Sequence, residues 1–579
     1  MTEEEYTHIR HTLAHLLGAS VLALYPDSKL ALGPAIENGF YYDIDASSKI
    51  TDADLPAIEA KMCELLPGWT DFTREVVNVE GAKKHFAGND YKLELIDEII
   101  EKGEDITLYT SGGFTDLCRG GHAKHPSKDI PSGCFKLDRV AGAYWRGDEG
   151  NKMLTRIYGL ALPSKAELDA YIAQQEEAKK RDHRKLGKEL GLFVFSDLVG
   201  PGLPLWTPRG TIIRELLNDY VWELRKAHGY QKVTIPHITK KELYERSGHW
   251  AKYADDLFKI ETRESKIYAM KPMNCPHHTQ IFDSEPRSYR DMPQRYCETT
   301  MVYRDEQSGE LSGLSRVLSI TQDDAHVFCR ESQIEDEVLA IWDIVEKFYG
   351  TFGFELKVRF SRHDPATPEK YLGGADVWKK AENALENLMT SKGVTWIDGL
   401  GEAAFYGPKI DFISHDSIGR VLQVATIQLD FNQPKNFGLT CTNEKGEKEE
   451  IVMIHCAIMG SIERFLSTLI EHVNGNFPLW LSPVEVAVIP VRDNHAVYTK
   501  EIADALAARD IRVIHFDGDE NLGKRIRRAK EMRTPYMVVA GDKEVESGML
   551  TIEKRDGTKS EMTKDDFIAL LAEEIQNKK

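Results

Sequence analysis

The chain has 579 residues, which is too long for a single hydrophobic core and predicts about three or four domains. Its hydrophobic content of 41% and charged content of 29% are typical of a globular protein, and no apolar run reaches the roughly 18 residues that span a bilayer. A net charge of −19 excludes indiscriminate binding to nucleic acid, because attraction to phosphates is the sequence-independent part of such affinity. Binding to RNA therefore requires a local concentration of positive charge.

The first residues and the cysteines limit the cellular location and the kinds of metal site. The N-terminus, MTEEE, is acidic and lacks the basic and apolar regions of a secretory signal, which predicts a cytoplasmic protein. The 8 cysteines include no Cys-x-x-Cys pair, which disfavours a disulfide framework and a zinc ribbon. Any metal site must then be assembled from residues that lie far apart in the sequence.

Residues 1–163 contain two pairs of potential ligands, each pair four residues apart. The first predicted helix carries His11 and His15, which project from one face one turn apart. Cys118 and His122 have the same separation across a Gly-Gly turn. Helical histidines at this spacing bind zinc in metalloproteases, but Thr12 stands where the glutamate base would follow the first histidine. Unrelated polar residues therefore remain an alternative to a functional site.

Residues 164–190 form a predicted polar helix with the basic run KKRDHRK, which is most simply a solvated face. The largest predicted domain follows and opens with an amphipathic helix. Thr207 supplies its N-cap, Pro208 its first turn, and Gly229 ends it. Apolar residues share one face of this helix: Ile212, Ile213, Leu216, Leu217, Tyr220, Val221 and Leu224. An ordinary core helix and a helix at a subunit interface both fit this pattern.

A predicted hairpin organises the same domain. Two strand-like runs, 299–303 and 314–320, flank a polar, glycine-containing loop. Arg304 and Arg316 lie on its two arms, and guanidinium groups bind phosphate oxygens through two parallel hydrogen bonds. Directly after the hairpin, residues 322–326 (QDDAH) offer an amide, two carboxylates and an imidazole. Considered without further context, a solvated loop explains these acids as well as a site does.

The rest of the chain alternates between helical and strand-like segments. Residues 332–400 are expected to be a helical insertion. Three later strand-like runs alternate with helical stretches: 484–491, 511–516 and 536–540. They predict a small α/β unit with a parallel sheet, and the absence of Gly-x-Gly-x-x-Gly disfavours a nucleotide-binding Rossmann domain. The run KRIRRAK at 524–530 supplies the local positive charge that RNA binding requires.

These segments resemble the class II aminoacyl-tRNA synthetases. The hairpin is similar to their motif 2, the helix that begins at Pro208 to motif 1, and GSIERF at 460–465 to motif 3. TQDDAH at 321–326 is similar to the threonyl-tRNA synthetases in particular, and the His-x-x-x-His and Cys-x-x-x-His pairs resemble the editing domain shared by threonyl- and alanyl-tRNA synthetases. The resemblance implies a multidomain α+β and α/β fold in four parts: an α+β editing domain at 1–163, a linker helix at 164–190, a class II catalytic domain on an antiparallel sheet at 191–477, and an α/β anticodon-binding domain at 478–579.

The activity implied by the resemblance is ATP-dependent ligation of L-threonine to tRNA(Thr) through a threonyl-adenylate, with hydrolytic editing of seryl-tRNA(Thr). A site built around a hydroxyl rejects valine by about 10⁴-fold or more, whereas the methyl that serine lacks is worth only roughly 10- to 200-fold. A second, hydrolytic site is therefore expected. The implied partners and cofactors are tRNA(Thr), L-threonine, ATP with Mg²⁺, one Zn²⁺ per chain, and a second copy of the chain in a homodimer, with no membrane.

The resemblance also assigns roles to individual residues. Cys275, His326 and His455 are implied zinc ligands, and one sulfur with two nitrogens suits Zn²⁺ and leaves positions open for substrate. The residues implied to act in the catalytic pocket are Arg304, Arg316, Gln322, Asp324, Tyr406, Lys409, Gln423, Thr426, Gln428 and Arg464. The implied editing residues are His11, His15, Lys92, Asp116, Cys118 and His122. The implied anticodon-binding residues are Glu546 and Arg555.

Several departures from the family pattern restrict this transfer of roles. The editing motif starts at residue 11, so the small ubiquitin-like domain that often precedes it is expected to be absent. Ile320 replaces a usual Phe, which weakens the expected stacking on adenine. Cys456 stands where Arg usually follows the motif 3 histidine, Asp519 replaces an anticodon-reading Asn, and His277 replaces a glycine. The family contacts at 456 and 519 are therefore not carried over.

Two other functions fit parts of the sequence. A synthetase paralogue that only binds a ligand or a partner should have lost the paired arginines or the implied zinc ligands, and this chain keeps both. A stand-alone hydrolase of mischarged tRNA would not need residues 191–475. The pattern as a whole favours the complete synthetase.

Overall fold

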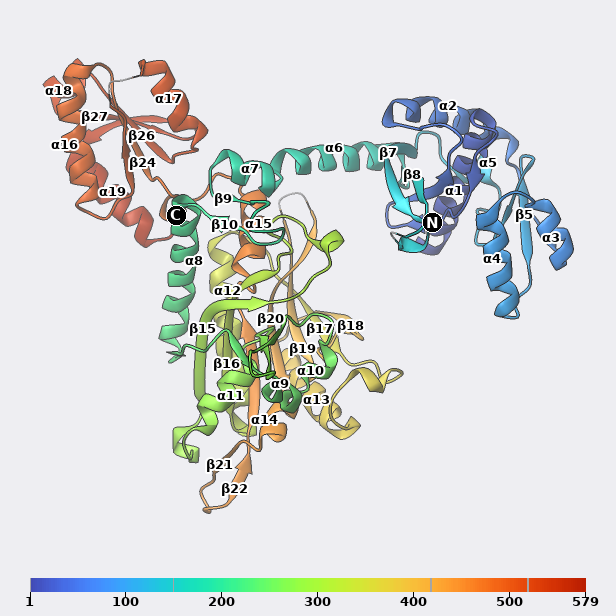
Figure 1. The fold of residues 1–579 in the computed structure, drawn as a ribbon. Helices are drawn as coiled ribbons and strands as arrows, with labels where there is room; N and C mark the ends of the chain where they lie inside the picture. Colours follow the sequence, from blue (N-terminus) through green and yellow to red (C-terminus); the bar gives the residue numbers. More distant parts are fainter. Residues whose placement is uncertain (1, 149, 417–418, 518–519) are drawn as a thin grey trace. The chain divides into compact units, whose positions relative to one another are not determined.

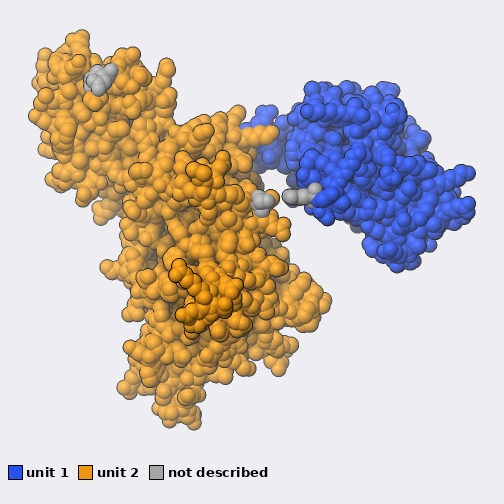
Figure 2. Space-filling view, viewed as in Figure 1, with its two compact units in different colours: residues 1–176 blue, residues 177–579 orange. Residues whose placement is uncertain are grey.

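The computed structural model describes residues 2–148, 150–416, 419–517 and 520–579. The chain forms two compact units, residues 1–176 and residues 177–579 (Figure 2). Among the described residues, no helix combines the length and the apolar character needed to cross a membrane.

Unit 1 begins with helix α1 (Glu3–Leu24), which packs against a mixed-length antiparallel sheet (Figure 1). The helix starts at Thr2, whose side chain accepts a hydrogen bond from the Glu5 N–H while the Glu5 carboxylate accepts one from the Thr2 N–H. The sheet has the order β1-β3-β8-β7, with β2 paired to β3. Its strands and the helices beside it are β1 (Lys29–Leu30), β2 (Ala35–Ile36), β3 (Gly39–Asp45), β8 (Met153–Ala161), β7 (Phe135–Tyr144), α2 (Leu55–Leu65) and α5 (Pro126–Asp129).

A second, smaller layer completes unit 1. Three antiparallel strands form it: β4 (Thr73–Val76), β5 (Thr107–Ser111) and β6 (Phe114–Leu117). Helices α3 (Val79–His85) and α4 (Asp90–Glu101) pack against Ile106 and Leu108, and together they form a small separate hydrophobic core. The unit is therefore an α+β domain in which α1, α4 and β6 come from three separate parts of the sequence.

The predicted polar helix at 164–190 is two helices, α6 (Lys165–Arg181) and α7 (His183–Glu189). The break falls at Asp182, whose carboxylate accepts a hydrogen bond from the Arg184 N–H at 2.8 Å and so caps α7. The helical character was predicted correctly, and the capping aspartate inside the basic run is the reason for the break.

The core of unit 2 is an eight-stranded sheet of the described residues, in the order β11-β15-β16-β23-β20-β19-β17-β18. Only the outer pairs β11–β15 and β17–β18 are parallel, and the pairs between them are antiparallel. The strands are β11 (Gln231–Lys232), β15 (Gln294–Tyr303), β16 (Ser319–Cys329), β23 (Val452–Ala457), β20 (Val421–Asp430), β19 (Lys409–His415), β17 (Lys357–Arg362) and β18 (Trp396–Leu400).

Three helices bury one face of this sheet. They are α8 (Pro208–Ala227), α12 (Ile334–Thr351) and α15 (Ile462–His472). Helix α8 is the helix predicted from its capping residues: Thr207 Oγ1 accepts a hydrogen bond from the Gly210 N–H at 3.3 Å, and Gly229 has the positive φ of a helix stop. Ile213, Leu217 and Val221 of its predicted stripe are buried in the main core.

Smaller elements surround the sheet. The helices are α9 (Lys241–Ser247), α10 (His249–Lys252), α11 (Cys275–Asp283), α13 (Ala375–Ser391) and α14 (Asn432–Phe437). The short strands are β9 (Phe193–Val194), β10 (Leu205–Trp206), β12 (Ile238–Lys240), β13 (Lys259–Glu261), β14 (Ile267–Met270), β21 (Thr440–Thr442) and β22 (Lys448–Glu450). Cys275 is the first residue of α11.

Three local interpretations of the sequence differ from the structure. The second arm of the hairpin begins at Ser319, not at residue 314, and residues 322–326 lie inside β16 and not in a loop after it. Pairing of β16 with both β15 and β23 buries these polar residues in the middle of the sheet. The expected helical insertion at 332–400 also contains β17 and β18, because β17 pairs with β19 as part of the main sheet.

The last hundred residues form a five-stranded sheet with the order β25-β24-β26-β27-β28. Its three parallel strands were predicted: β24 (Val486–Pro490), β25 (Val513–His515) and β26 (Tyr536–Ala540). The antiparallel hairpin of β27 (Met549–Lys554) and β28 (Lys559–Thr563) was missed, although the Asp556-Gly557 turn between them is a strong hairpin signal. The helices are α16 (Ala496–Ala507), α17 (Leu522–Glu531), α18 (Asp542–Ser547) and α19 (Lys564–Gln576).

Candidate functional site

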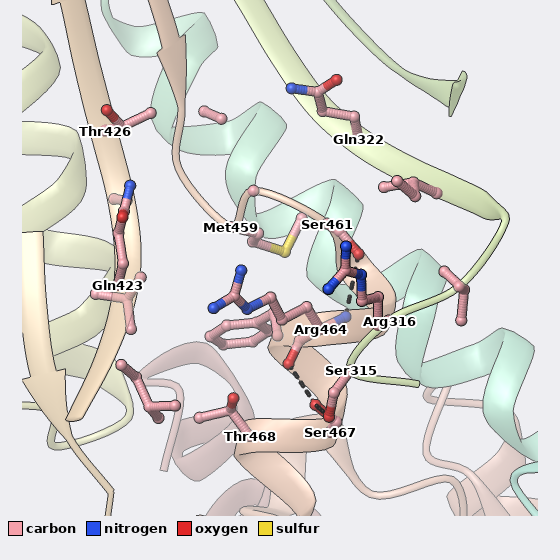
Figure 3. Close-up of a pocket in the computed structure, with 18 of the residues that line it drawn as sticks. Ser315, Arg316, Gln322, Gln423, Thr426, Met459, Ser461, Arg464, Ser467 and Thr468 are labelled. Carbon is pink, nitrogen blue, oxygen red and sulfur yellow. Dashed lines mark hydrogen bonds between the residues drawn. The ribbon is translucent and has the colours of Figure 1, made fainter. Parts of the chain in front are cut away.

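A cavity of about 700 Å³ opens in unit 2 where the β15–β16 hairpin, β20 and the start of α15 meet (Figure 3). Its size is that of a small-molecule pocket. Figure 3 shows the side chains of Arg316 and Arg464 reaching into the space between Gln423 and Ser461. The predicted residues that line the cavity are Arg304, Arg316, Gln322, Gln423, Thr426 and Arg464.

The three arginines of the cavity are held in different ways. Arg304 stands over the ring of Tyr253 at 5.9 Å, and the described residues offer its buried Nε no acceptor. Arg316 is exposed and pairs with Glu306 at 2.6 Å and with Glu310 at 3.1 Å. The exposed Arg464 lies off the buried stripe of α15. The cavity therefore presents cationic groups that suit an anionic ligand such as a polyphosphate.

Cys275, His326 and His455 form a buried cluster whose potential ligand atoms all lie within 4.8 Å of one another. Their elements explain the convergence. His326 of β16 and His455 of β23 are direct partners across the antiparallel ladder, and Cys275 begins α11, which packs against β16. The structure thus brings together three residues that the sequence separates widely.

Neighbouring polar groups orient two of the three potential ligands, His455 and Cys275. His455 Nε2 lies 2.9 Å from Asp430 Oδ2, which leaves Nδ1 of that ring as the atom free to bind a metal. Gln433 donates hydrogen bonds to Cys275 Sγ at 3.5 Å and to Asp430 Oδ2 at 3.0 Å. Such carboxylate and amide partners fix the ring orientation of metal-binding histidines. Asp430 and Gln433 were missed in the sequence, where only a polar run after an apolar strand marks them.

The donor set of the cluster fits a zinc ion. Burial raises the pKa of the Cys275 thiol well above its ordinary value, against a smaller lowering by the hydrogen bond from Gln433. Burial likewise lowers the pKa of His326 well below its ordinary value, so that ring is neutral. A buried cation removes the thiol proton and uses neutral imidazoles as ligands, and a Cys-His-His set is typical of zinc.

Asp324 lies beside this cluster. Its Oδ1 is 3.6 Å from His326 Nε2, and its Oδ2 accepts a hydrogen bond from Asn274 Nδ2 at 2.9 Å. Burial raises the pKa of Asp324 to about 6, so the carboxylate form still dominates at neutral pH. Tyr406 stacks on the His455 ring at 4.7 Å and donates a hydrogen bond to Gln428. These residues form a polar wall next to the potential metal ligands.

One buried carboxylate connects several predicted residues. Asp411, 0% exposed, accepts hydrogen bonds from Gln423 at 2.8 Å and Thr426 at 2.9 Å, and pairs with Lys409 at 3.2 Å. Arg359 also donates to it, at 2.9 Å. Asp411 and Arg359 were not among the residues predicted from the sequence. Their only signal was a charged residue inside an otherwise apolar strand, which folding leaves buried and in need of partners.

Unit 1 contains a second cluster, formed by His11, His15, Cys118 and His122. The ring nitrogen Nε2 of His11 lies 3.2 Å from Nε2 of His15 and 3.5 Å from Cys118 Sγ. Cys118 Sγ lies 3.4 Å from His122 Nε2. The two i, i+4 pairs therefore come together, one from α1 and one from the glycine turn after β6.

Asp116 connects this second cluster to neighbouring buried side chains. Its carboxylate contacts Lys92 Nζ at 2.5 Å, accepts a hydrogen bond from Tyr42 OH at 2.5 Å, and lies 3.3 Å from His15 Nδ1. The predicted residues Lys92 and Asp116 are thus part of the cluster. Tyr42 was missed, because a tyrosine in a strand of apolar and aromatic residues gives no sign that its hydroxyl meets an acid.

Electrostatics make Cys118 an ionised thiol. Burial alone would raise its pKa, but hydrogen bonds from His11, His122 and His15 lower the pKa of Cys118 to about 3. For His15, burial acts to lower the pKa, and Asp116 together with Cys118 raises it to about 9. Burial lowers the pKa of His122, which leaves that ring neutral. The cluster therefore combines a thiolate, an imidazolium and a neutral imidazole.

The predicted anticodon-binding residues lie in the C-terminal part of unit 2. Glu546 is exposed on α18, whereas Arg555 follows β27 and donates a hydrogen bond to the Phe477 carbonyl at 2.8 Å. Burial lowers the pKa of Arg555 to about 10. Helix α17 carries the predicted basic run, where Lys524 and Arg528 both pair with Glu520 and Arg527 is exposed.

The departures from the family pattern have different surroundings. Ile320 lines the cavity, and Cys456 is buried in β23 with its Sγ 3.7 Å from Tyr230 OH. His277 is buried, and neither of its ring nitrogens has a hydrogen-bond partner among the described residues. Asp519 lies outside the described residues.

Comparisons with known proteins agree with this architecture. Residues 258–473 match the family described as tRNA synthetase class II core domain (G, H, P, S and T), and residues 485–574 match the anticodon binding domain. Threonine–tRNA ligase from Phocaeicola vulgatus is 47% identical over 574 residues, which is 98% of this chain and 88% of the relative. The same-named protein from Thermotoga neapolitana is 46% identical with equal coverage. The chain belongs to the threonine–tRNA ligase family.

A solved structure supports the same assignment. The RNA binding domain of threonyl-tRNA synthetase from Cryptosporidium parvum superposes with a TM-score of 0.65 at 34% identity, over 68% of this chain and 98% of that one. The predicted family and the predicted fold class are thereby confirmed: a threonine–tRNA ligase with an α+β N-terminal unit, a class II core on a largely antiparallel sheet, and an α/β anticodon-binding domain. The assignments of individual site residues and the exact domain boundaries stay predictions.

Proposed function

We propose that this chain ligates L-threonine to tRNA(Thr) at the expense of ATP through a threonyl-adenylate, and that unit 1 hydrolyses mischarged seryl-tRNA(Thr). The observation that supports the first activity is the course of β16. Along one face of this strand, Gln322 lines the arginine-rich cavity, Asp324 follows, and His326 belongs to the Cys-His-His cluster. A nucleotide in the cavity and an amino acid at the cluster would therefore meet on one strand.

Adenylate formation needs alignment and charge neutralisation more than proton transfer, because a carboxylate attacks the α-phosphate in line. Arg304 finds no acceptor for its buried Nε in the described part of the chain and is our candidate for contacting both the α-phosphate and the amino-acid carboxylate. Arg316 and Arg464 would contact the rest of ATP, which enters with Mg²⁺. Since Arg316 is paired with Glu306 and Glu310, binding of the triphosphate exchanges these carboxylates for phosphate oxygens.

The Cys-His-His cluster would select the amino acid. Cys275, His326 and His455 would hold Zn²⁺, which when bound supplies a Lewis acid with open positions for the amino and hydroxyl groups of threonine. Asp324, fixed by Asn274, would accept the hydrogen bond of the substrate hydroxyl. Valine lacks that hydroxyl and would leave a buried carboxylate unpaired, which explains how the site rejects it.

The cluster of unit 1 would hydrolyse the ester that joins serine to tRNA. The neutral His122 imidazole can accept a proton from a water molecule as its oxygen attacks the ester carbon. Cys118 as a thiolate and His15 as an imidazolium form a fixed charge pair beside it, and Asp116 with Lys92 holds that pair in place. Serine keeps the hydroxyl that the catalytic pocket recognises, so this second site removes what the first accepts.

Threonine-dependent exchange of pyrophosphate into ATP by the purified chain tests the proposal. Exchange with threonine and none with valine is the expected result. A zinc-loaded protein without threonine-dependent exchange would refute the ligase activity. Hydrolysis of seryl-tRNA(Thr), measured on separately prepared substrate, tests the editing activity independently.

We further propose that the chain forms a homodimer and acts in the cytoplasm. Next to a cavity of about 730 Å³, Val194 is 50% exposed, Phe195 42% and Leu198 99%. Apolar side chains exposed together at a polar-rimmed surface are typical of a protein interface. Analytical ultracentrifugation should give twice the chain mass, and a monomer at micromolar concentration would contradict the homodimer.

A further inference from the structure

Two adjacent aspartates of β16 face opposite sides of the main sheet, because side chains alternate along a strand. Asp324 faces the candidate amino-acid site. Asp323, 0% exposed, faces the helical layer, where its Oδ1 accepts a hydrogen bond from Arg225 of α8. Arg225 is 2% exposed. The proposed reaction makes no direct use of this buried ion pair.

Asp323 holds the segment that leads from β23 into α15. Its Oδ2 accepts hydrogen bonds from the backbone N–H groups of Ile458 at 3.0 Å and Met459 at 3.1 Å. Its own N–H donates to the Gly460 carbonyl at 2.9 Å. One residue thus makes three hydrogen bonds to residues 458–460 and clamps them against β16.

The clamped segment forms part of the cavity. Met459, Gly460 and Ser461 line it, and Ser461 caps α15 by accepting a hydrogen bond from the Arg464 N–H at 3.1 Å. The position of Arg464 therefore depends on a segment that Asp323 fixes. A displacement of about 1 Å in such positioning groups can cost roughly 100-fold in rate.

The clamp depends on the position of the Asp323 carboxylate. A buried carboxylate needs a compensating partner, and removal of that partner strongly destabilises its surroundings. Arg225 supplies the counter-charge from a helix 98 residues away in sequence. Its guanidinium lies 5.8 Å from the ring of Tyr230, whose hydroxyl contacts Cys456 Sγ.

We propose that Arg225 is a positioning residue for adenylate formation: it holds the Asp323 carboxylate through a buried ion pair, so that the 458–460 segment and Arg464 stay in place for ATP. This inference rests on the proposed binding of ATP in the cavity. It extends the functional network across the sheet, to a residue that contacts neither substrate.

The strand register indicates a second position, 456, from which a positive charge could reach Asp323. Cys456 is the direct partner of Ala325 in the β16–β23 ladder, so it lies diagonally opposite Asp323 on the same face. Diagonal neighbours are within reach of a long side chain. An arginine at 456 could therefore reach the Asp323 carboxylate from β23, provided that the guanidinium of Arg225 no longer occupies the space.

The test compares Arg225→Met, Cys456→Arg and the double variant Arg225→Met/Cys456→Arg in pyrophosphate exchange. Lys226→Met, at the exposed neighbouring position of α8, is the matched control. We expect Arg225→Met to lower kcat/KM for ATP by about 100-fold, mainly through weaker ATP binding and a higher KM for ATP, with KM for threonine and the zinc content unchanged. The double variant should regain at least about tenfold of that loss, whereas Cys456→Arg as a single change should be harmful, because coupled residues are not additive.

Several outcomes would overturn the inference: an Arg225→Met enzyme with normal KM for ATP, equal losses for ATP and threonine, or a double variant no better than the two single changes combined. If Arg225→Met does not fold, as judged by circular dichroism, Arg225→Lys replaces it, and a KM for ATP equal to that of the wild type then contradicts the role. Calorimetric titration with ATP separates this failure from that of the proposed function. Wild-type protein that binds no ATP refutes both, whereas wild-type protein that exchanges pyrophosphate while the variants bind ATP normally refutes only the inference.

Discussion

The two histidine–cysteine clusters of this chain use similar side chains in opposite electrostatic settings. In unit 1, three imidazoles surround Cys118 and lower its pKa to about 3. In unit 2, Cys275 meets an amide as its main hydrogen-bond donor, and burial raises its pKa well above the ordinary value. One thiol is therefore ionised by its own protein neighbours, whereas the other needs a cation.

This difference assigns a role to each cluster. A site that creates its own thiolate and imidazolium has the charges for hydrolysis without further help. A buried Cys-His-His site stabilises a metal ion, because binding the metal releases the thiol proton and satisfies all three groups. The comparison predicts that metal dependence belongs to adenylate formation and not to editing.

Replacing Cys275 should have the largest effect. Cys275→Ala removes one of three proposed metal ligands, and a Lewis acid of this kind is worth several kcal/mol, so exchange should fall by at least about 10³-fold. Zinc content measured by mass spectrometry should fall in parallel. Cys118→Ala is the matched control, since it removes a thiol from the other cluster and should retain both zinc and exchange. Full pyrophosphate exchange by metal-free protein would show that adenylate formation does not depend on the metal.

Replacing Cys118 should affect only the second activity. Cys118→Ala removes the thiolate of the proposed charge pair and should slow hydrolysis of seryl-tRNA(Thr) by about 10²- to 10³-fold, the range for loss of one electrostatic group from an active site. Threonylation should remain at the wild-type rate. Cys63→Ala changes an exposed cysteine of the same unit and serves as the control. Undiminished hydrolysis by Cys118→Ala would place the editing site elsewhere.

Asp324→Asn should produce a smaller, selective effect. The amide keeps the shape of the carboxylate but loses its charge, and a hydrogen bond to a charged group is worth about 10- to 100-fold in affinity. KM for threonine should rise by that factor while activity with valine changes little, so discrimination between the two amino acids falls. The ratio of the pyrophosphate-exchange rates with threonine and with valine measures this discrimination. An unchanged ratio would remove Asp324 from recognition of the hydroxyl.

Local spacing explains what could be predicted from the sequence. Capping residues marked α8, the i, i+4 pattern marked His11 and His15 on one face of α1, and a polar loop between strand-like runs marked the arginine-bearing hairpin. Each of these signals is local, because its residues belong to a single helix or to two consecutive strands. The proposed zinc ligands came only from family resemblance, because no spacing rule connects residues 275, 326 and 455.

Long-range register explains what could not be predicted. Asp411, Tyr42 and the Arg225–Asp323 pair act through partners that strand pairing and helix packing bring together. Residues 322–326 were interpretable as a solvated loop because their polarity hides their place at the centre of a sheet. From sequence alone, polar residues in a strand are expected to be exposed, and only the pairing with both neighbouring strands shows that they are buried.

The smallest expected effect is a pH dependence that separates the two clusters further. The lowered pKa of Cys118, about 3, keeps the thiolate at every pH above that value, and the raised pKa of His15, about 9, keeps the imidazolium below it. Because Cys118 stays ionised, the rate of seryl-tRNA(Thr) hydrolysis should vary only a few-fold between about pH 6 and 8. The rate should decline as the pH rises through 9, where His15 loses its proton. A thiol with an ordinary pKa near 9 would instead give a rate that climbs about tenfold per pH unit below that value. Single-turnover hydrolysis across this range distinguishes the two, and a steep rise toward pH 9 would show that the imidazoles do not ionise Cys118.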